Sequence, residues 1–229
     1  MSDEKSLKYN EPWILQRADP YVYRHTDGSY YFTASVPAYD GIVLRRAGSL
    51  AELSGAEEVM IWKKHESGPM SYHIWAPEIH YLFGKWYIYF AGGEKEDIWK
   101  IRPYVLECSG DDPLTDEWVE LGKMKRAAED EFSFEAFSLD ATVFENKGEY
   151  YYVWAEKVGV GKMISNLYIA KMESGNQLKT VQVLLTTPDY DWERKGFWVN
   201  EGPAVIHHDG KMFLTYSASE TGVDYCVGM

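Results

Sequence analysis

A short motif that recurs four times along the chain limits the fold more than any other feature of the sequence. Each copy precedes a short apolar strand pattern, a glycine turn and a strand pattern rich in aromatic residues. The copies are Asp19-Pro20-Tyr21-Val22, Ala76-Pro77-Glu78-Ile79, Asp140-Ala141-Thr142-Val143 and Asn200-Glu201-Gly202-Pro203-Ala204-Val205. The turn glycines that follow, Gly28, Gly84, Gly148 and Gly210, lie 56, 64 and 62 residues apart. A repeat of that length is typical of radially arranged sheets that pack against their neighbours, so we predict an all-β fold of the β-propeller type.

The repeat divides the chain into four predicted blades within a single domain over residues 1–229. Their approximate limits are 16–64, 73–124, 137–188 and 198–229. A complete blade has four strands, which in the first blade are 21–23, 30–34, 42–46 and 58–62, with a helical turn within 49–58. In the fourth blade the repeat register puts Met229 at the end of the third strand. Because a propeller closes its ring to avoid open sheet edges, we expect a C-terminally incomplete propeller that self-associates or pairs with a complementing C-terminal segment.

The charge of the chain narrows the classes of partner. With 23 basic and 36 acidic residues, the formal net charge is −13, which repels phosphate backbones and anionic lipid surfaces. We therefore expect no nucleic acid partner and no membrane partner, and no apolar run approaches the roughly 20 residues that span a bilayer. The residues from Met1 to Lys5 do not begin a signal peptide, so we predict a cytoplasmic protein, or an extracellular one if a leader was removed.

Acidic residues stand at the heads of three of the four repeats. Alignment on the turn glycines gives Asp19, Ala76, Asp140 and Gly202 equivalent positions, with Glu201 one residue earlier, at the position of Trp75. Because blade heads converge near the axis of a propeller, we expect the three carboxyl groups to line one axial pocket. A single acid at a strand head can serve turn geometry alone. Three like charges brought together cost stability and indicate a functional site.

Paired carboxyl groups in a pocket are the machinery of glycoside hydrolysis. One protonates the leaving oxygen, while the other activates water or attacks the sugar. A third carboxylate can raise the pKa of the acid by repulsion, so that the acid keeps its proton near neutral pH. The sequence has no nucleophile elbow, phosphate-binding loop, dinucleotide fingerprint or Cys/His metal spacing. We therefore predict a hydrolase whose chemistry requires no cofactor and no metal site.

The predicted substrate-binding residues are Trp75, His73 and Asn200. Trp75 flanks a strand head, where a tryptophan either packs into the core or offers a flat apolar face to a sugar ring. Trp75 is favoured over the other tryptophans near strand heads because its repeat position matches that of Glu201. His73 is either a ligand of a sugar hydroxyl or a structural histidine, and Asn200 directly precedes Glu201 in the fourth motif.

Four segments together resemble glycoside hydrolase family 43, and the resemblance extends over the whole chain. The segments are RADPYVYRHTDGSYYFTAS, HIWAPEIHYLFGKWYIYFAGG, FSLDATVFENKGEYYYVWAE and NEGPAVIHHDGKMFLTYSAS. The resemblance implies a five-bladed β-propeller, of which about four blades are present here, that hydrolyses arabinose- or xylose-containing glycans with inversion. It also implies that Asp19 is the general base and Glu201 the general acid, and that Asp140 orients the acid and modulates its pKa.

Within this family the sequence looks most similar to the α-L-arabinofuranosidases that act on arabinan side chains or ends. The implied function is exo-acting hydrolysis of arabinan- or arabinoxylan-derived oligosaccharides, so the expected partner is a neutral pentose-containing oligosaccharide or polysaccharide. The alternatives are a β-xylosidase or endo-arabinanase of the same family, and a propeller that binds glycan or protein without catalysis. The resemblance also allows an axial calcium ion, near which a further blade of the family normally supplies a histidine.

Overall fold

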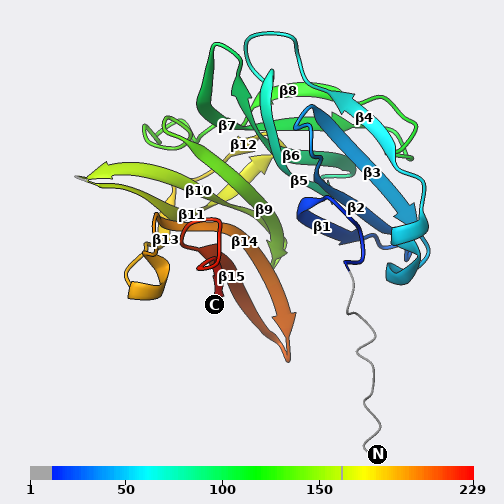
Figure 1. The fold of residues 1–229 in the computed structure, drawn as a ribbon. Helices are drawn as coiled ribbons and strands as arrows, with labels where there is room; N and C mark the ends of the chain where they lie inside the picture. Colours follow the sequence, from blue (N-terminus) through cyan, green and yellow to red (C-terminus); the bar gives the residue numbers. More distant parts are fainter. Residues whose placement is uncertain (1–11, 161) are drawn as a thin grey trace, which may run out of the picture.

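Strands dominate the computed structural model, which describes residues 12–160 and 162–229 (Figure 1). The first sheet has the order β1-β2-β3-β4, with bounds Ala18–Arg24, Tyr30–Ser35, Gly41–Ala47 and Val59–Lys63. The second has the order β5-β6-β7-β8, with bounds Tyr72–Leu82, Lys85–Glu94, Asp97–Cys108 and Val119–Lys123. Two short 3₁₀ helices, η1 (Leu50–Gly55) and η2 (Asp191–Glu193), lie between strands, η1 within the predicted helical turn. Neither has the length and hydrophobicity of a membrane span, and no other helix in the described ranges does.

The third and fourth repeats join in one eight-stranded sheet, whereas the sequence predicted separate blades. The third repeat supplies β9 (Ser138–Asn146), β10 (Glu149–Val160), β11 (Lys162–Ser174), β12 (Gln177–Leu178) and β13 (Val183–Thr186). The fourth supplies β14 (Trp198–His208), β15 (Lys211–Ala218) and β16 (Cys226–Gly228). The join is a parallel pairing of Ile164 with Trp198 and of Ser165 with Val199. It forms because β11 begins before the residues that pair with β13, and this early part runs beside the head of β14.

Glycine turns close the hairpins where the repeat predicted them. In three of these turns the glycine follows another residue with positive φ: Phe83 and Gly84 (51° and 76°), Lys147 and Gly148 (54° and 78°), and Asp209 and Gly210 (48° and 70°). Two consecutive residues with positive φ define a type I′ turn, whose twist matches that of the paired strands. The turns therefore set the strand register, and with it the positions of the strand heads.

The sheets pack face to face through aromatic side chains. Tyr31 of the first sheet lies 4.8 Å from Trp86 of the second, measured between ring centroids, and Tyr89 of the second lies 5.4 Å from Tyr152 of the third. All four side chains are buried. Burying each such group contributes on the order of 1.5–3 kcal/mol. This close packing holds the heads of β1, β5 and β9 in fixed relative positions.

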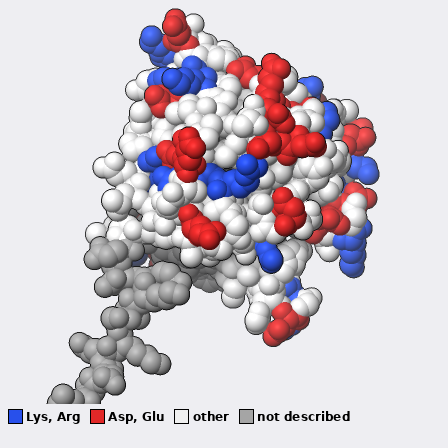
Figure 2. Space-filling view, turned by 90° about the vertical axis from the view of Figure 1, so that its right-hand side faces the viewer, with Lys and Arg blue, Asp and Glu red and all other residues white. Residues whose placement is uncertain are grey.

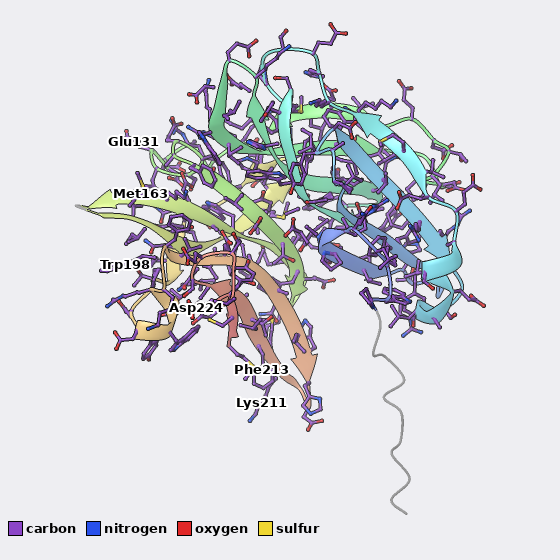
Figure 3. The ribbon with its side chains drawn as sticks, viewed as in Figure 1. Glu131, Met163, Trp198, Lys211, Phe213 and Asp224 are labelled. Atoms are coloured by element: carbon purple, nitrogen blue, oxygen red, sulfur yellow. The ribbon has the colours of Figure 1, made fainter. Side chains whose placement is uncertain are left out.

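The β14–β15 hairpin extends away from the packed sheets, and Lys211 and Phe213 mark its far end (Figure 3). Along β15 the side chains are exposed or half-buried until Ala218. On the face of the molecule seen in Figure 2, acidic and basic side chains are interspersed. The net charge of −13 is therefore not gathered into a single acidic patch on that face.

Candidate active site

A backbone bulge with a left-handed residue recurs at the head of each repeat. Asp19, Ala76, Asp140 and Gly202 have φ values of 49°, 45°, 51° and 57°, and strand pairing shifts register beside each of them. These are the four positions that the repeat alignment made equivalent. Left-handed backbone costs free energy for a residue other than glycine, and such strain is concentrated at functional sites. The bulges bend the strand heads where they converge.

The four repeat heads surround an inner cavity of about 340 Å³. Three of its lining residues carry carboxyl groups, namely Asp19, Glu78 and Asp140. The other lining residues are Pro20, Tyr21, Ala76, Ala141, Gly202, Pro203, Ala204, Ser217 and Tyr225. Every repeat contributes to this wall, so the cavity lies where the sequence predicted an axial pocket.

An outer cavity of about 620 Å³ shares Asp19, Asp140 and Tyr225 with the inner one. Glu201 and Trp75 also line it, so all three predicted catalytic acids border the same space. Its remaining wall is largely aromatic and aliphatic and includes Tyr39, Phe137, Leu139, Met163, Phe197, Trp198 and Val199. Met163 and Trp198, on β11 and β14, lie on the same side of the molecule in Figure 3. Apolar walls with a few convergent polar groups are typical of small-molecule sites.

Asp19 is held at the contact between the first two sheets. The Ser35 hydroxyl on β2 donates a hydrogen bond to Asp19 Oδ2 at 2.7 Å and accepts one from the backbone N–H of Ala76 at 2.8 Å. One hydroxyl thus connects two of the strained strand heads. The Asp19 side chain itself remains exposed to the cavity.

Asp140 and Glu201 form the centre of the acid cluster. The backbone N–H of Gly202 donates to Asp140 Oδ2 at 3.1 Å, which connects β9 to β14. Burial raises the pKa of Asp140 well above its usual value, and the charges of Glu201 and then Asp19 raise it further. Burial also raises the pKa of Glu201, because water is withdrawn from a group that would otherwise ionise. The cluster can therefore hold a proton at a pH where an exposed carboxyl group has lost it.

Tyr225 is a site residue that the sequence analysis missed. Its hydroxyl donates to Glu201 Oε1 at 3.1 Å, and its ring lines both cavities. Tyr225 stands in the segment between β15 and β16, where a repeat alignment of strands carries no information. The hydrogen bond stabilises the ionised form of Glu201 and so opposes the rise in its pKa.

Glu78 is a fourth carboxyl group, and it too was missed. Its Oε2 lies 2.9 Å from Nε2 of His80, whose Nδ1 lies 3.5 Å from the Tyr21 hydroxyl. Burial raises the pKa of Glu78, and the hydrogen bond from His80 opposes that rise. The strand period of two pairs this group with His80, because the two residues share one face of β5 after the bulge at Ala76.

Comparison with known proteins decides the family. The family model described as glycosyl hydrolases family 43 matches residues 9–229. The chain belongs to this family. It is 48% identical over 221 residues to the extracellular exo-alpha-(1->5)-L-arabinofuranosidase of Streptomyces chartreusis, covering 96% of this chain and 66% of the relative. It is 46% identical over 225 residues to alpha-L-arabinofuranosidase 43 of Humicola insolens, covering 98% and 45%.

Solved structures agree with this assignment. The crystal structure of alpha-L-arabinofuranosidase from Lactobacillus brevis matches with a TM-score of 0.85 and 52% identity, covering 95% of this chain and 68% of that one. A thermostable family-43 glycoside hydrolase matches with a TM-score of 0.71 at 24% identity, which supports the fold alone. The predicted all-β propeller fold is confirmed. This family 43 chain holds part of the propeller and spans about two thirds or less of the curated relatives it matches.

The three predicted substrate-binding residues of this family 43 chain do not all line the cavity. Trp75 is half-buried and lines the outer cavity as predicted. The His73 ring lies against Trp75, with 4.2 Å between the ring centroids and a tilt of 34°, and neither of its nitrogens has a hydrogen-bond partner among the described residues. His73 does not line either cavity. Its place beside the Trp75 ring fits the alternative that His73 is a structural histidine.

Asn200 corrects a prediction. Its side chain is fully buried, and Nδ2 donates to Thr186 Oγ1 of β13 at 3.1 Å. Because strand side chains alternate, Asn200 points away from the cavity that its neighbour Glu201 lines. Asn200 is therefore a structural contact between β13 and β14 and is not placed to bind a substrate there.

The described residues do not by themselves make a metal site. Within the two described ranges, no group of three or more His, Cys, Asp or Glu side chains is arranged to hold a metal ion. The acids that line the cavities are instead engaged by the Ser35 hydroxyl, the Gly202 N–H and the Tyr225 hydroxyl. The described residues therefore show no such side-chain group, and an axial calcium ion stays a prediction.

Proposed function

We propose that this chain carries the catalytic carboxyl groups of an inverting glycoside hydrolase that releases L-arabinofuranose from the ends of neutral arabinose-containing glycans. The observation that carries the proposal is that Asp19, Asp140 and Glu201, from three different repeats, border one cavity. The names of the relatives support an exo-acting α-L-arabinofuranosidase, because two of them are called exo-alpha-(1->5)-L-arabinofuranosidases.

The geometry supports the following division of roles. Glu201, whose pKa is raised by burial, donates its proton to the glycosidic oxygen as the bond from that oxygen to the anomeric carbon breaks. Asp19 accepts a proton from the water that attacks the anomeric carbon on the opposite face. One water is consumed, the leaving hydroxyl gains the Glu201 proton, and the configuration inverts. Asp140 accepts the Gly202 N–H, and the charge of Glu201 raises the pKa of Asp140. Because repulsion between two carboxylates is mutual, an ionised Asp140 opposes ionisation of Glu201 in turn.

The shape and charge of the outer cavity suit a neutral sugar. Trp75 and Tyr39 offer aromatic faces to the apolar side of a sugar ring. Three carboxyl groups in the same wall repel an anionic substrate. The expected substrate is therefore a neutral arabinose-containing oligosaccharide or the end of a longer chain.

Two Streptomyces relatives are named extracellular enzymes. Their names support the extracellular alternative for this protein, while no comparison supports the cytoplasmic location expected from the N-terminal sequence.

The first test compares an aryl α-L-arabinofuranoside, an aryl β-xyloside and linear arabinan as substrates, with Glu201→Gln as the variant. We expect hydrolysis of the arabinofuranoside and a loss of at least about 100-fold in kcat for Glu201→Gln, because general acid catalysis contributes 10²–10⁴-fold. NMR of the first product should detect the β-anomer, as inversion requires. Unchanged turnover in Glu201→Gln would exclude Glu201 as the acid. Sugar binding without hydrolysis by the wild type would favour the non-catalytic propeller.

A further inference from the structure

Lys157 on β10 places a positive charge in the acid-lined outer cavity. Its half-buried side chain lines that cavity together with Glu201, Asp140 and Trp75. The charge of Lys157 acts on Glu201 and favours its ionised form. No role in the catalytic scheme above requires this lysine, so its presence in the wall calls for a separate explanation.

The carboxyl group of Glu156, next to Lys157 on β10, holds the loop before β9 in place. The fully buried Glu156 carboxylate accepts hydrogen bonds from the backbone N–H of Phe134 at 2.9 Å and of Ala136 at 3.1 Å. It also accepts one from Trp154 Nε1 at 2.8 Å. The loop before β9 is thereby fixed against β10. A buried, multiply bonded carboxylate is a rigid anchor.

The same loop positions the Lys157 side chain. The backbone N–H of Lys157 donates to the carbonyl of Phe137 at 2.9 Å, and Lys157 Nζ lies 3.9 Å from the centre of the Phe137 ring. An ammonium group over an aromatic face is held by cation–π attraction, and its N–H donors on the side away from the ring can still bind an acceptor. Among the described residues the ammonium group makes neither an ion pair nor a side-chain hydrogen bond. Burial lowers the pKa of Lys157, and Glu201 opposes that change.

The charged groups that line the outer cavity with Lys157 determine which kind of ligand its ammonium group can bind. An ammonium group donates up to three hydrogen bonds and accepts none, so it pairs with hydroxyl or carboxylate oxygens. The cavity that Lys157 lines also contains Asp19, Asp140 and Glu201, which repel a carboxylate ligand. The hydroxyl groups of a neutral sugar satisfy the lysine without this repulsion.

We propose that Lys157 is a substrate-binding residue whose ammonium group donates hydrogen bonds to hydroxyl oxygens of the sugar unit beside Glu201. The inference deepens the function proposed above and rests on it. It adds a polar specificity contact to a wall whose other predicted substrate contact, Trp75, is a flat apolar surface.

The test measures binding of α-(1,5)-linked arabinotriose by calorimetry in the Glu201→Gln background, where the sugar is not consumed. We expect Lys157→Met to weaken binding by about tenfold or more, because a hydrogen bond to a charged group is lost. Lys157→Arg, which keeps the charge and donors, should retain most of the affinity. Lys211→Met is the matched control, since Lys211 is exposed at the far end of the β14–β15 hairpin (Figure 3). Circular dichroism verifies the fold of each variant.

The outcomes separate this inference from the proposed function. Equal affinity of the Lys157→Met and parent proteins would overturn the role of Lys157 while leaving the hydrolase intact. Lysine-dependent binding in a protein whose wild type hydrolyses no arabinoside would keep the contact and reject the proposed activity. Absence of any binding would overturn both. Tighter binding of a uronic-acid-bearing oligosaccharide, lost in Lys157→Met, would overturn the assignment to neutral hydroxyls.

Discussion

Asp140 of the third repeat and Glu201 of the fourth line the same cavity, and their charges interact. Gly202, directly after Glu201, donates its backbone N–H to Asp140. This hydrogen bond keeps the Asp140 carboxyl group beside the residue that follows Glu201. Each raises the cost of ionising the other, and the last proton of the pair is lost only at an elevated pH. In the proposed mechanism, this elevated pH is the upper limit of the range in which Glu201 keeps the proton that it donates.

Replacing Asp140 by Asn should lower the basic limb of the pH profile of kcat/KM. The change removes the negative charge that opposes ionisation of Glu201, so Glu201 loses its proton at a lower pH. We expect a downward shift of this limb, measured with an aryl α-L-arabinofuranoside. Asp209→Asn is the control, because Asp209 is 85% exposed at the tip of the β14–β15 hairpin. A basic limb that stays in place would remove Asp140 from the tuning role.

Tyr225→Phe should move the same limb in the opposite direction. The hydroxyl of Tyr225 stabilises the Glu201 carboxylate through a hydrogen bond of 3.1 Å, which lowers the pKa of Glu201. Burial and the charge of Asp19 both raise that pKa, and without the hydrogen bond their effect is larger. The pKa of Glu201 should therefore rise, since a hydrogen bond that stabilises its ionised form is removed. The pH dependence of kcat/KM measures this shift. A downward shift would contradict the geometry.

At the scale of the strand, the repeated bulge is the structural unit that presents the acids. The left-handed position is occupied by Asp19, Asp140 and Gly202, which tolerate that conformation, and by Ala76, which does not. A β-carbon at φ 45° crowds the backbone. The bulge at Ala76 is thus maintained by the surrounding sheet and by the Ser35 hydroxyl that accepts its N–H.

Ala76→Gly should relieve this strain and raise the free energy of unfolding by up to about 1 kcal/mol, because glycine adopts positive φ without penalty. Ala170→Gly provides the matched comparison in the buried interior of β11, where loss of the methyl group and the flexibility of glycine should destabilise by about 1–2 kcal/mol. Urea denaturation measures both. Equal destabilisation by the two substitutions would mean that Ala76 is not strained.

The sequence repeat predicted which residues occupy the bulge positions, but it did not predict every residue of the site. Turn glycines and alternating aromatics are local signals, and they predicted the equivalence of Asp19, Ala76, Asp140 and Gly202 that the backbone confirms. Tyr225 was missed because its position depends on the path of a loop. Lys157 was missed because it lies at the extended end of β10. Burial of Asn200 depends on the β13–β14 contact, which has no local signature.

At the scale of the whole molecule, apolar surface gathers around the third and fourth repeats. Val227, on the edge strand β16, is 74% exposed, and Val183 on the outer strand β13 is 60% exposed. β16 pairs with β15 alone among the described strands, which leaves its other side without a partner. An unpaired strand edge beside apolar side chains is a template for another strand.

We therefore predict that the chain self-associates through this edge. Sedimentation velocity over a range of concentrations should detect dimers or larger species. Val227→Lys should weaken the association by at least about tenfold, because a charge on an edge strand opposes further pairing. Leu50→Lys serves as the control, since Leu50 in η1 is 51% exposed on the first repeat, away from the edge. A monomer at all concentrations would exclude self-association, and a dimer insensitive to Val227→Lys would place the contact elsewhere. Because Tyr225, which donates a hydrogen bond to Glu201, stands two residues before Val227, association that depends on Val227 should also alter kcat/KM with protein concentration.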